Sequence, residues 1–497
     1  MRICGVFLLL LSLTALQSCS TTSSVSRLYE MADRRELDSE LWQAAAQSGD
    51  DEQRTTALRL LGRIGGDPVV DLLLPSLQHE RPEIRLEAAF ALGISGSVNA
   101  IAPLHARLTE ESNAEVASAI WLALANLAAP RLQSQLVDAW DHEPEQHQTL
   151  AQAAAFLWAY HRDKLQQLDR GLVNRLMQAA RSDNVALASN SAAALARVRK
   201  EPGVFRRHVV IDTLKNAPVE RSRQLLLKVL GANSDAVGDA FLRDVLAGKA
   251  YRDTPPSDAE RAEAAAALVG RLDDKALMAF IQAMKDEPSW SVRALALQSL
   301  SAEQVNRLRA ELQAHIEAVP ADRAVLTPLL QPIAFRDETE EPANATADYH
   351  DVSKAGGTQI RLNTSRGDID IELLPEAPYT AANFVELVRK GYYDGTVFHR
   401  VIPNFVAQGG DPTGRGDGGP GYRIREELSR LSHDRGYIGM ATAGKDTAGS
   451  QFFFNTERNP HLDWHYTVFA KVMRGENIMM ALQQGDTIVS AKVLEKR

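Results

Sequence analysis

The run F-H-R-V-I-P-N-F-V-A-Q-G-G-D, Phe398 to Asp411, is the most informative stretch of this chain. Three further blocks follow it: G-M-A-T-A-G at Gly439 to Gly444, S-Q-F-F-F-N-T at Ser450 to Thr456, and H-L-D-W-H-Y-T-V-F-A-K-V at His461 to Val472. Aromatic and β-branched runs separated by glycine-rich segments are typical of strands joined by turns. Upstream, I-R-L-N-T and D-I-D-I-E-L also alternate as strands. We therefore expect a compact β-rich domain over residues 359–497.

One helix is expected inside this domain. The segment T-A-A-N-F-V-E-L-V-R-K-G has helical spacing and predicts a helix that begins near Thr380 and ends at Gly391. Taken in order, the four blocks resemble the signature blocks of cyclophilin-type peptidyl-prolyl cis/trans isomerases. The resemblance implies a closed eight-stranded antiparallel barrel capped by two helices, with the active site on its outer face.

The resemblance places Arg400 at the catalytic position. Rotation about an X-Pro bond must break amide resonance, against a barrier of about 18–20 kcal/mol. At the twisted transition state the prolyl nitrogen regains a lone pair. A guanidinium that donates to this lone pair binds the transition state better than either ground state. Its pKa, above about 12, excludes true proton donation.

Ten further residues stand at substrate-binding positions of the family. Four of them imply an apolar cup for the proline ring: Phe405, Val406, Phe453 and Leu462. The others imply contacts with the peptide backbone or with the rim of the cup: Gln408, Ala441, Thr442, Gln451, His461 and Tyr466. Gln408 would also help to hold Arg400, and Thr442 would anchor the peptide that precedes the proline. No cofactor and no metal is implied.

An all-α region is expected over residues 30–335, because apolar residues recur there at spacings of three and four. The motif A-L-R-L-L-G at Ala57 returns as A-A-F-A-L-G at Ala88 and as A-I-W-L-A-L at Ala119, a step of about 31 residues. A single helix pair of this length cannot bury its apolar stripe, whereas stacked pairs share a continuous core.

The repeats resemble HEAT or HEAT-like repeats and imply an α-solenoid with a protein partner on its concave surface. Tetratricopeptide repeats are the main rival, but their Trp-Leu-Gly-Tyr signature is missing. The polar, acidic segment D-E-T-E-E-P-A-N-A-T-A-D-Y-H-D lacks apolar periodicity. We interpret residues 336–358 as a linker between the two domains.

The N-terminus has the form of an export signal, because Arg2 precedes a short apolar run that ends in L-Q-S-C at Cys19. This ending resembles a bacterial lipobox, which implies a signal peptide over residues 1–18, a lipid on Cys19 and a flexible tether over 19–29. Ser20 after that cysteine resembles the outer-membrane sorting pattern. We therefore expect an envelope lipoprotein that faces the periplasm. The alternative is an ordinary secretory signal in which Cys19 is incidental.

The charge of the chain bears on its partners. The net charge is −9 at pH 7, and no cluster of Lys and Arg interrupts the sequence. Such a chain would be repelled by phosphate backbones, so we expect no nucleic-acid partner. The sequence favours an envelope peptidyl-prolyl isomerase that acts on proline-containing polypeptides, with the solenoid recruiting partners or clients. The alternative functions are a scaffold whose C-terminal fold binds prolines without turnover, and envelope assembly by the solenoid alone.

Overall fold

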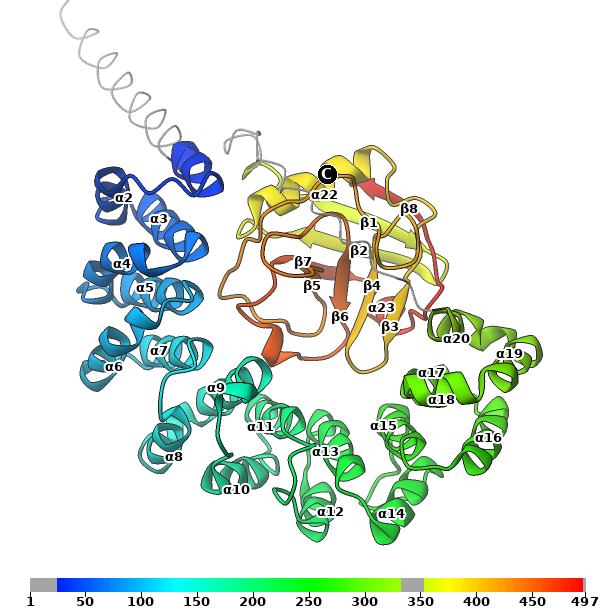
Figure 1. The fold of residues 1–497 in the computed structure, drawn as a ribbon. Helices are drawn as coiled ribbons and strands as arrows, with labels where there is room; N and C mark the ends of the chain where they lie inside the picture. Colours follow the sequence, from blue (N-terminus) through cyan, green and yellow to red (C-terminus); the bar gives the residue numbers. More distant parts are fainter. Residues whose placement is uncertain (1–24, 332–352, 495–497) are drawn as a thin grey trace, which may run out of the picture.

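The chain folds into an array of helices followed by a β-rich domain (Figure 1). The computed structural model describes residues 25–331 and 353–494. The expected signal peptide 1–18, Cys19 and most of the expected linker 336–358 lie outside these ranges. No helix in the described ranges is long and apolar enough to cross a membrane.

The helical array consists of two rows of helices. The inner row holds α3 (Asp51–Ile64), α5 (Pro82–Ile94), α7 (Ala114–Asn126), α9 (His147–Tyr160), α11 (Val185–Arg197), α13 (Glu220–Ala232), α15 (Asp258–Val269) and α17 (Trp290–Gln298). These inner helices pack on one another in sequence. All of them except α7 contribute a polar contact to the C-terminal domain among the described residues. The outer row holds α2 (Ser39–Ala46), α4 (Val70–Leu77), α6 (Ile101–Glu110), α8 (Leu132–His142), α10 (Arg170–Ala179), α12 (Arg207–Asn216), α14 (Ala236–Leu246) and α16 (Asp274–Ala283). The array ends with α18 (Ala302–Arg307), α19 (Arg309–Ala318) and α20 (Arg323–Leu330).

The expected repeats are confirmed as stacked helix pairs. The three related motifs lie on successive inner helices, and in the first two a glycine at the same place in the motif lets neighbouring helices approach closely. A Cβ on Gly62 would lie 2.8 Å from the Ala91 backbone, and one on Gly93 would lie 2.8 Å from Ala123. The recurring small residue therefore fixes how tightly one repeat stacks on the next.

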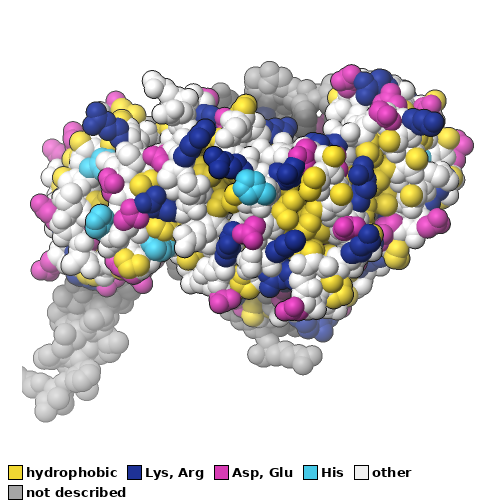
Figure 2. All heavy atoms as spheres, turned by 90° about the horizontal axis from the view of Figure 1, so that it is seen from below, with side chains coloured by type: hydrophobic (Ala, Val, Ile, Leu, Met, Phe, Trp, Pro, Cys, Tyr) yellow, Lys and Arg dark blue, Asp and Glu magenta, His cyan; other side chains and the backbone are white. Residues whose placement is uncertain are grey.

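Ion pairs also connect successive repeats. Arg59 on α3 pairs with Glu87 on α5 at 2.7 Å, and Arg85 pairs with Glu111 at 2.8 Å. Burial alone would raise the pKa of Glu111, but hydrogen bonds, first among them that of Arg85, lower it to about 2. Figure 2 views the side of the array that carries α10, α12 and α14, where acidic and basic side chains are interspersed.

Helical structure begins earlier than expected. Residues 25–33 are helical, although the sequence analysis assigned 19–29 to a flexible tether. Val25, Leu28 and Met31 are buried, and the last two belong to the core of the array. The spacing of three residues places these apolar side chains on one helical face, which explains why this segment packs onto the array.

The C-terminal domain is built on an antiparallel sheet of eight strands, in the order β3-β4-β6-β5-β7-β2-β1-β8. Its strands are β1 (Gln359–Thr364), β2 (Gly367–Leu373), β3 (Arg400–Ile402), β4 (Val406–Gly409), β5 (Tyr437–Met440), β6 (Phe452–Asn455), β7 (Val468–Arg474) and β8 (Ile488–Val493). The sheet is accompanied by the helices α22 (Pro378–Arg389) and α23 (Glu476–Met480). In the core of the domain, Phe384 on α22 contacts the rings of Phe452 and Phe469.

The sheet is a curled half-barrel rather than the closed barrel implied by the resemblance. Strands β3 and β8 are its two margins, and no ladder joins them in the described residues. Val397 and Thr487, which precede these strands, instead form an isolated bridge. The marginal strand β3 is only three residues long, which leaves little backbone to pair with β8.

The array curves around the C-terminal domain, so its concave side faces the sheet and its loops (Figure 1). Near the start of the array, the rings of Tyr29 and Tyr379 lie 5.1 Å apart. Near its end, Gln484 Nε2 donates to the carbonyl of Ala324 at 2.6 Å. The two parts therefore contact each other along the whole length of the arc.

Candidate active site

The Arg400 side chain is oriented by a chain of glutamines. Arg400 on β3 is the register partner of Gln408 on β4, and its Nη1 donates to Gln408 Oε1 at 3.2 Å. Gln408 Nε2 donates to Gln451 Oε1 at 3.0 Å, and Gln451 Nε2 donates to the carbonyls of Gly416 and Gly418. The short hairpin and the glycine-rich loop together fix the direction of the guanidinium.

An apolar cluster lies beside this chain. It consists of side chains from several strands and loops: the buried Val406, Phe453 and Leu462, with the partly buried Phe405, Ala441 and Tyr466 packed against them. The Arg400 guanidinium carbon lies 5.9 Å from the centre of the Phe405 ring, within cation–π range. An oriented donor and an apolar surface therefore meet at one place, an arrangement suited to a ligand with an apolar ring and a nearby nitrogen.

The electrostatics favour a charged Arg400 and neutral histidines. Desolvation lowers the pKa of Arg400, while Tyr466 acts to raise it, and an arginine remains protonated at neutral pH. Burial also lowers the pKa of His399, and neither of its ring nitrogens has a hydrogen-bond partner among the described residues. His399 is therefore not held as a general base.

His461 lies at the edge of the cluster but is largely covered by the array. Its ring stacks on Phe405 with centroids 5.8 Å apart, and only 7% of the residue is exposed. Arg197 on α11 donates to its Nε2 at 3.1 Å, and Tyr160 on α9 donates to its carbonyl at 2.6 Å. Burial, then the charge of Arg197, holds its pKa well below the usual range, so the ring is neutral.

The turn that leads into Phe405 is held by the array as well. Asn404 adopts a left-handed conformation with φ of 60°, and its carbonyl accepts from Arg221 on α13 at 2.9 Å. Its side-chain amide donates to the carbonyl of Ala259 and to Glu263 on α15. Asn adopts the left-handed region more readily than most residues, and these three contacts hold the turn in that conformation.

The sequence analysis did not find these supporting residues. Arg197, Arg221 and Glu263 lie more than 140 positions from their partners, in a region that was interpreted only as a repeat. An arginine on the buried face of a helix is one signal that could have indicated them. Arg221 is only 9% exposed.

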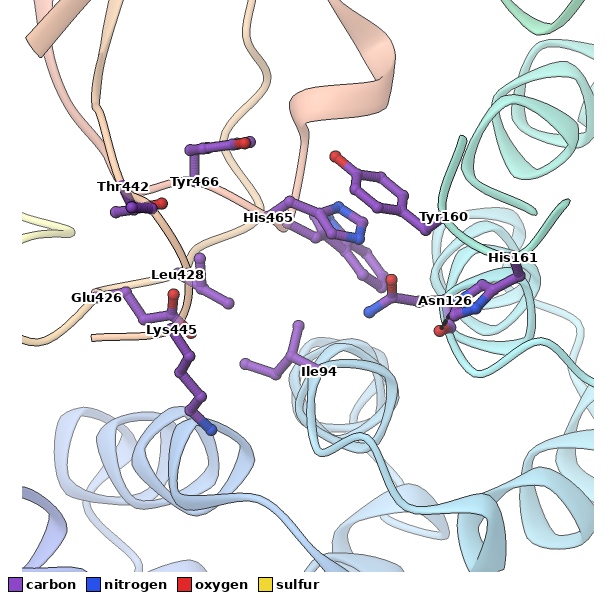
Figure 3. A pocket seen from close by; sticks show the side chains of 13 residues that line it. Ile94, Asn126, Tyr160, His161, Glu426, Leu428, Thr442, Lys445, His465 and Tyr466 are labelled. Atoms are coloured by element: carbon purple, nitrogen blue, oxygen red, sulfur yellow. Dashed lines mark hydrogen bonds between the residues drawn. The ribbon is translucent and has the colours of Figure 1, made fainter. Parts of the chain in front are cut away.

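Two of the expected binding residues border a cavity between the two parts of the molecule. The cavity has a volume of about 560 Å³. Thr442 and Tyr466 line it on the C-terminal domain, and Ile94, Asn126 and Tyr160 face them from the array (Figure 3). Because Tyr466 also contacts Phe453, with ring centroids 5.9 Å apart, the cavity adjoins the apolar cluster.

The comparisons with known proteins agree with this geometry. Residues 359–496 match the family model "Cyclophilin type peptidyl-prolyl cis-trans isomerase/CLD", and residues 39–125 match the model of HEAT repeats. A peptidyl-prolyl cis-trans isomerase of Synechococcus elongatus is 46% identical over 140 residues, which are 28% of this chain and 97% of that protein. Peptidyl-prolyl cis-trans isomerase B of Bacillus subtilis is 50% identical over 25% of this chain and 90% of that protein.

Among solved structures, a cyclophilin-type isomerase of Cryptosporidium parvum, crystallised in the presence of the dipeptide Ala-Pro, covers 28% of this chain and 99% of its own. Its sequence identity is 32% and its TM-score is 0.27. The HEAT repeats expected from the 31-residue step are confirmed by the family model and by the stacked helices. Through its C-terminal domain, this chain belongs to the cyclophilin-type peptidyl-prolyl cis-trans isomerase family.

Proposed function

We propose that the C-terminal domain isomerises X-Pro bonds in polypeptides and that Arg400 is the catalytic residue. The observation that carries this proposal is the Arg400–Gln408–Gln451 chain beside the apolar cluster. The guanidinium donates to the prolyl nitrogen only when twisting has restored its lone pair. Because this hydrogen bond exists only near the transition state, it accelerates the reaction without tightening ground-state binding.

The remaining site residues bind the peptide around the bond that rotates. The proline ring enters the cup of Phe405, Val406, Phe453 and Leu462, with Ala441, His461 and Tyr466 at its rim. The apolar side chains of the cup favour burial of a ring that has no N–H to satisfy. Gln408 and Gln451 contact the peptide backbone, and Thr442 anchors the residues that precede the proline. The catalytic step itself needs no cofactor.

The test is a protease-coupled assay of a short proline peptide with the full chain and with Arg400→Ala. Arg389→Ala is the matched control, since Arg389 is an exposed arginine at the end of α22. We expect Arg400→Ala to lose most of its turnover and Arg389→Ala to match the wild type. Equal rates for all three proteins would favour the alternative, a scaffold that binds prolines without turnover.

We also propose that the chain is a lipoprotein of the bacterial envelope. The L-Q-S-C run supports this, together with the cysteine count, since Cys4 would leave with the signal and Cys19 would carry the lipid. An acyl chain and a diacylglycerol together would anchor the protein firmly. Labelling of cells with a palmitate analogue should mark the wild type and leave Cys19→Ser unmarked. Labelling of both would contradict the proposal.

For the solenoid we propose a role in holding the isomerase domain. Its concave side, expected to dock a partner, contacts the chain's own C-terminal domain from Tyr29 to Ala324. Partner docking is then assigned to the outer row of helices, whose mixed charges face away from the domain (Figure 2). Crosslinking at the exposed Val237 on α14 should capture partners, whereas crosslinking at the inner Gln298 should yield only bonds within the chain.

A further inference from the structure

The cavity between the array and the isomerase domain is built from residues of both parts. On the array it is lined by the last residues of three successive inner helices, Ile94 of α5, Asn126 of α7 and Tyr160 of α9. These helix ends face the segment 442–445 and the segment 464–466 of the isomerase domain (Figure 3). An isomerase domain without the array would lack one entire wall of this cavity.

The array wall is held firmly against the isomerase domain. The Tyr160 ring stacks on His465 with centroids 3.6 Å apart, and Trp464 contacts Phe90 edge to face at 4.9 Å. Asn126 donates through its Nδ2 to the carbonyl of Gly93, which fixes its side chain. These contacts leave the cavity as an ordered space with defined walls, which a ligand can enter without first ordering the surrounding side chains.

The lining combines apolar side chains with polar ones, and its lysine is engaged in a hydrogen bond. Ile94, Leu428 and Trp464 present hydrocarbon, with the rings of Tyr160 and Tyr466 beside them. Lys445 donates through its Nζ to the carbonyl of Arg63 at 2.9 Å, so its charge is directed at the end of α3.

The other ionisable groups of the lining carry little fixed charge. Burial raises the pKa of Glu426 to about 7 and lowers that of His465 to about 4. Burial also lowers the pKa of His161, whose Nε2 bonds to the carbonyl of Asn126. The Glu426 carboxyl is therefore partly protonated at neutral pH, and the His465 ring is neutral. A space of this composition favours an apolar side chain over a charged one.

We propose that this cavity binds a bulky apolar side chain of the substrate, three residues before the proline, and that Ile94 is a specificity-determining residue. The inference rests on the proposed function, because Thr442 and Tyr466 belong both to the proposed peptide site and to the cavity wall. A peptide that passes Thr442 on its way out of the cup enters the cavity. The array thus selects among prolines by the residues that precede them.

The test compares peptides Gly-X-Ala-Ala-Pro-Phe in which X is Trp, Leu, Glu, Lys or Gly. With the full-length protein we expect kcat/KM for Trp and Leu to exceed that for Gly by about tenfold, as expected for burial of one large side chain. Ile94→Arg should reduce this ratio to about one. Val237→Arg, an exposed position on the outer helix α14, should retain the wild-type ratio.

A second variant and a second measurement keep the test decisive. Ile94→Ala removes the side chain without introducing charge and should reduce the ratio about threefold; circular dichroism should show wild-type helicity for both variants. Binding of the same peptides to Arg400→Ala, measured by calorimetry, reports the cavity independently of turnover. If the Trp and Leu peptides bind more tightly but the wild type shows no turnover, the proposed function is refuted and the cavity proposal stands. Equal values for all X, or a preference for Glu or for Lys, would overturn the cavity proposal.

Discussion

The two sides of the proposed active site differ in which part of the molecule bonds to their side chains. On the Arg400 side, every hydrogen bond of the Gln408 and Gln451 chain stays within the isomerase domain. On the Phe405 side, the flanking residues Asn404 and His461 are bound by helices of the array. The array also contacts β3, where Gln298 on α17 donates to the Val401 carbonyl. The difference therefore concerns side chains: the hydrogen bonds that orient the proposed catalytic donor belong to the isomerase domain, whereas the residues that flank the proposed proline cup are bound by the array.

The largest expected effect lies on the Arg400 side. Arg400→Lys keeps a positive charge but loses the planar fork that donates to Gln408 and to the substrate at once. We expect kcat/KM for a short proline peptide to fall by about 100-fold, comparable to the loss of one transition-state donor. A value within threefold of the wild type would mean that charge alone suffices, and would contradict the oriented-donor mechanism.

A smaller effect is expected on the Phe405 side. Arg221 is buried and forms no ion pair among residues 25–331 and 353–494, so Arg221→Met preserves its volume while removing the hydrogen bond to the Asn404 carbonyl. We expect folding to be retained and KM to rise about tenfold, with kcat changed less than threefold, because the cup loosens while the donor stays in place. Arg271→Met, in an outer-row ion pair with Asp239, is the control and should leave KM unchanged.

The pH dependence of the unfolding free energy tests the burial of Glu426, which lines the cavity between the array and the isomerase domain. Glu426 has a folded pKa of about 7, above the ordinary value of 4.5, because of burial and then the charge of Asp446. The folded state therefore holds this proton more tightly, so stability is lost as pH rises from about 4.5 through about 7. Since Glu426 is only half-buried, we expect a change of about 1 kcal/mol. Urea midpoints between pH 5 and 8 should show it, and Glu426→Gln should flatten the curve.

The smallest effect concerns a single hydroxyl. Tyr160→Phe removes the hydrogen bond to the His461 carbonyl but keeps the ring stacked on His465. We expect a loss of about 1 kcal/mol in unfolding free energy and at most a threefold rise in KM. A rise in KM as large as that of Arg221→Met would show that the hydrogen bond from Tyr160 supports the cup as strongly as the one from Arg221, which would contradict this prediction.

The sequence predicted the parts of the molecule that depend on local pattern. The four blocks located the β-rich domain, and the step between Ala57, Ala88 and Ala119 located the stacked helices. The helix from Val25 was missed because the serine-rich run before it masked its apolar spacing. The half-barrel was missed because the resemblance does not report the length of β3.

The contacts of the array with the active site could not be predicted. The partners Arg197 and His461 are separated by 264 positions, and Arg221 and Asn404 by 183. Such contacts depend on the curvature of the whole array, which results from many small rotations between repeats. The roles of the individual site residues, from Arg400 to Tyr466, remain predictions that the variants above test.

The arc of helices limits how the number of repeats can change during evolution. Open solenoids can gain or lose repeats, because each repeat contacts only its neighbours. Here the two ends of the arc are fixed to one folded body, at Tyr379 and at Gln484. Duplication of one repeat would lengthen the arc and detach one end. The number of repeats is therefore set by the circumference of the domain that they enclose.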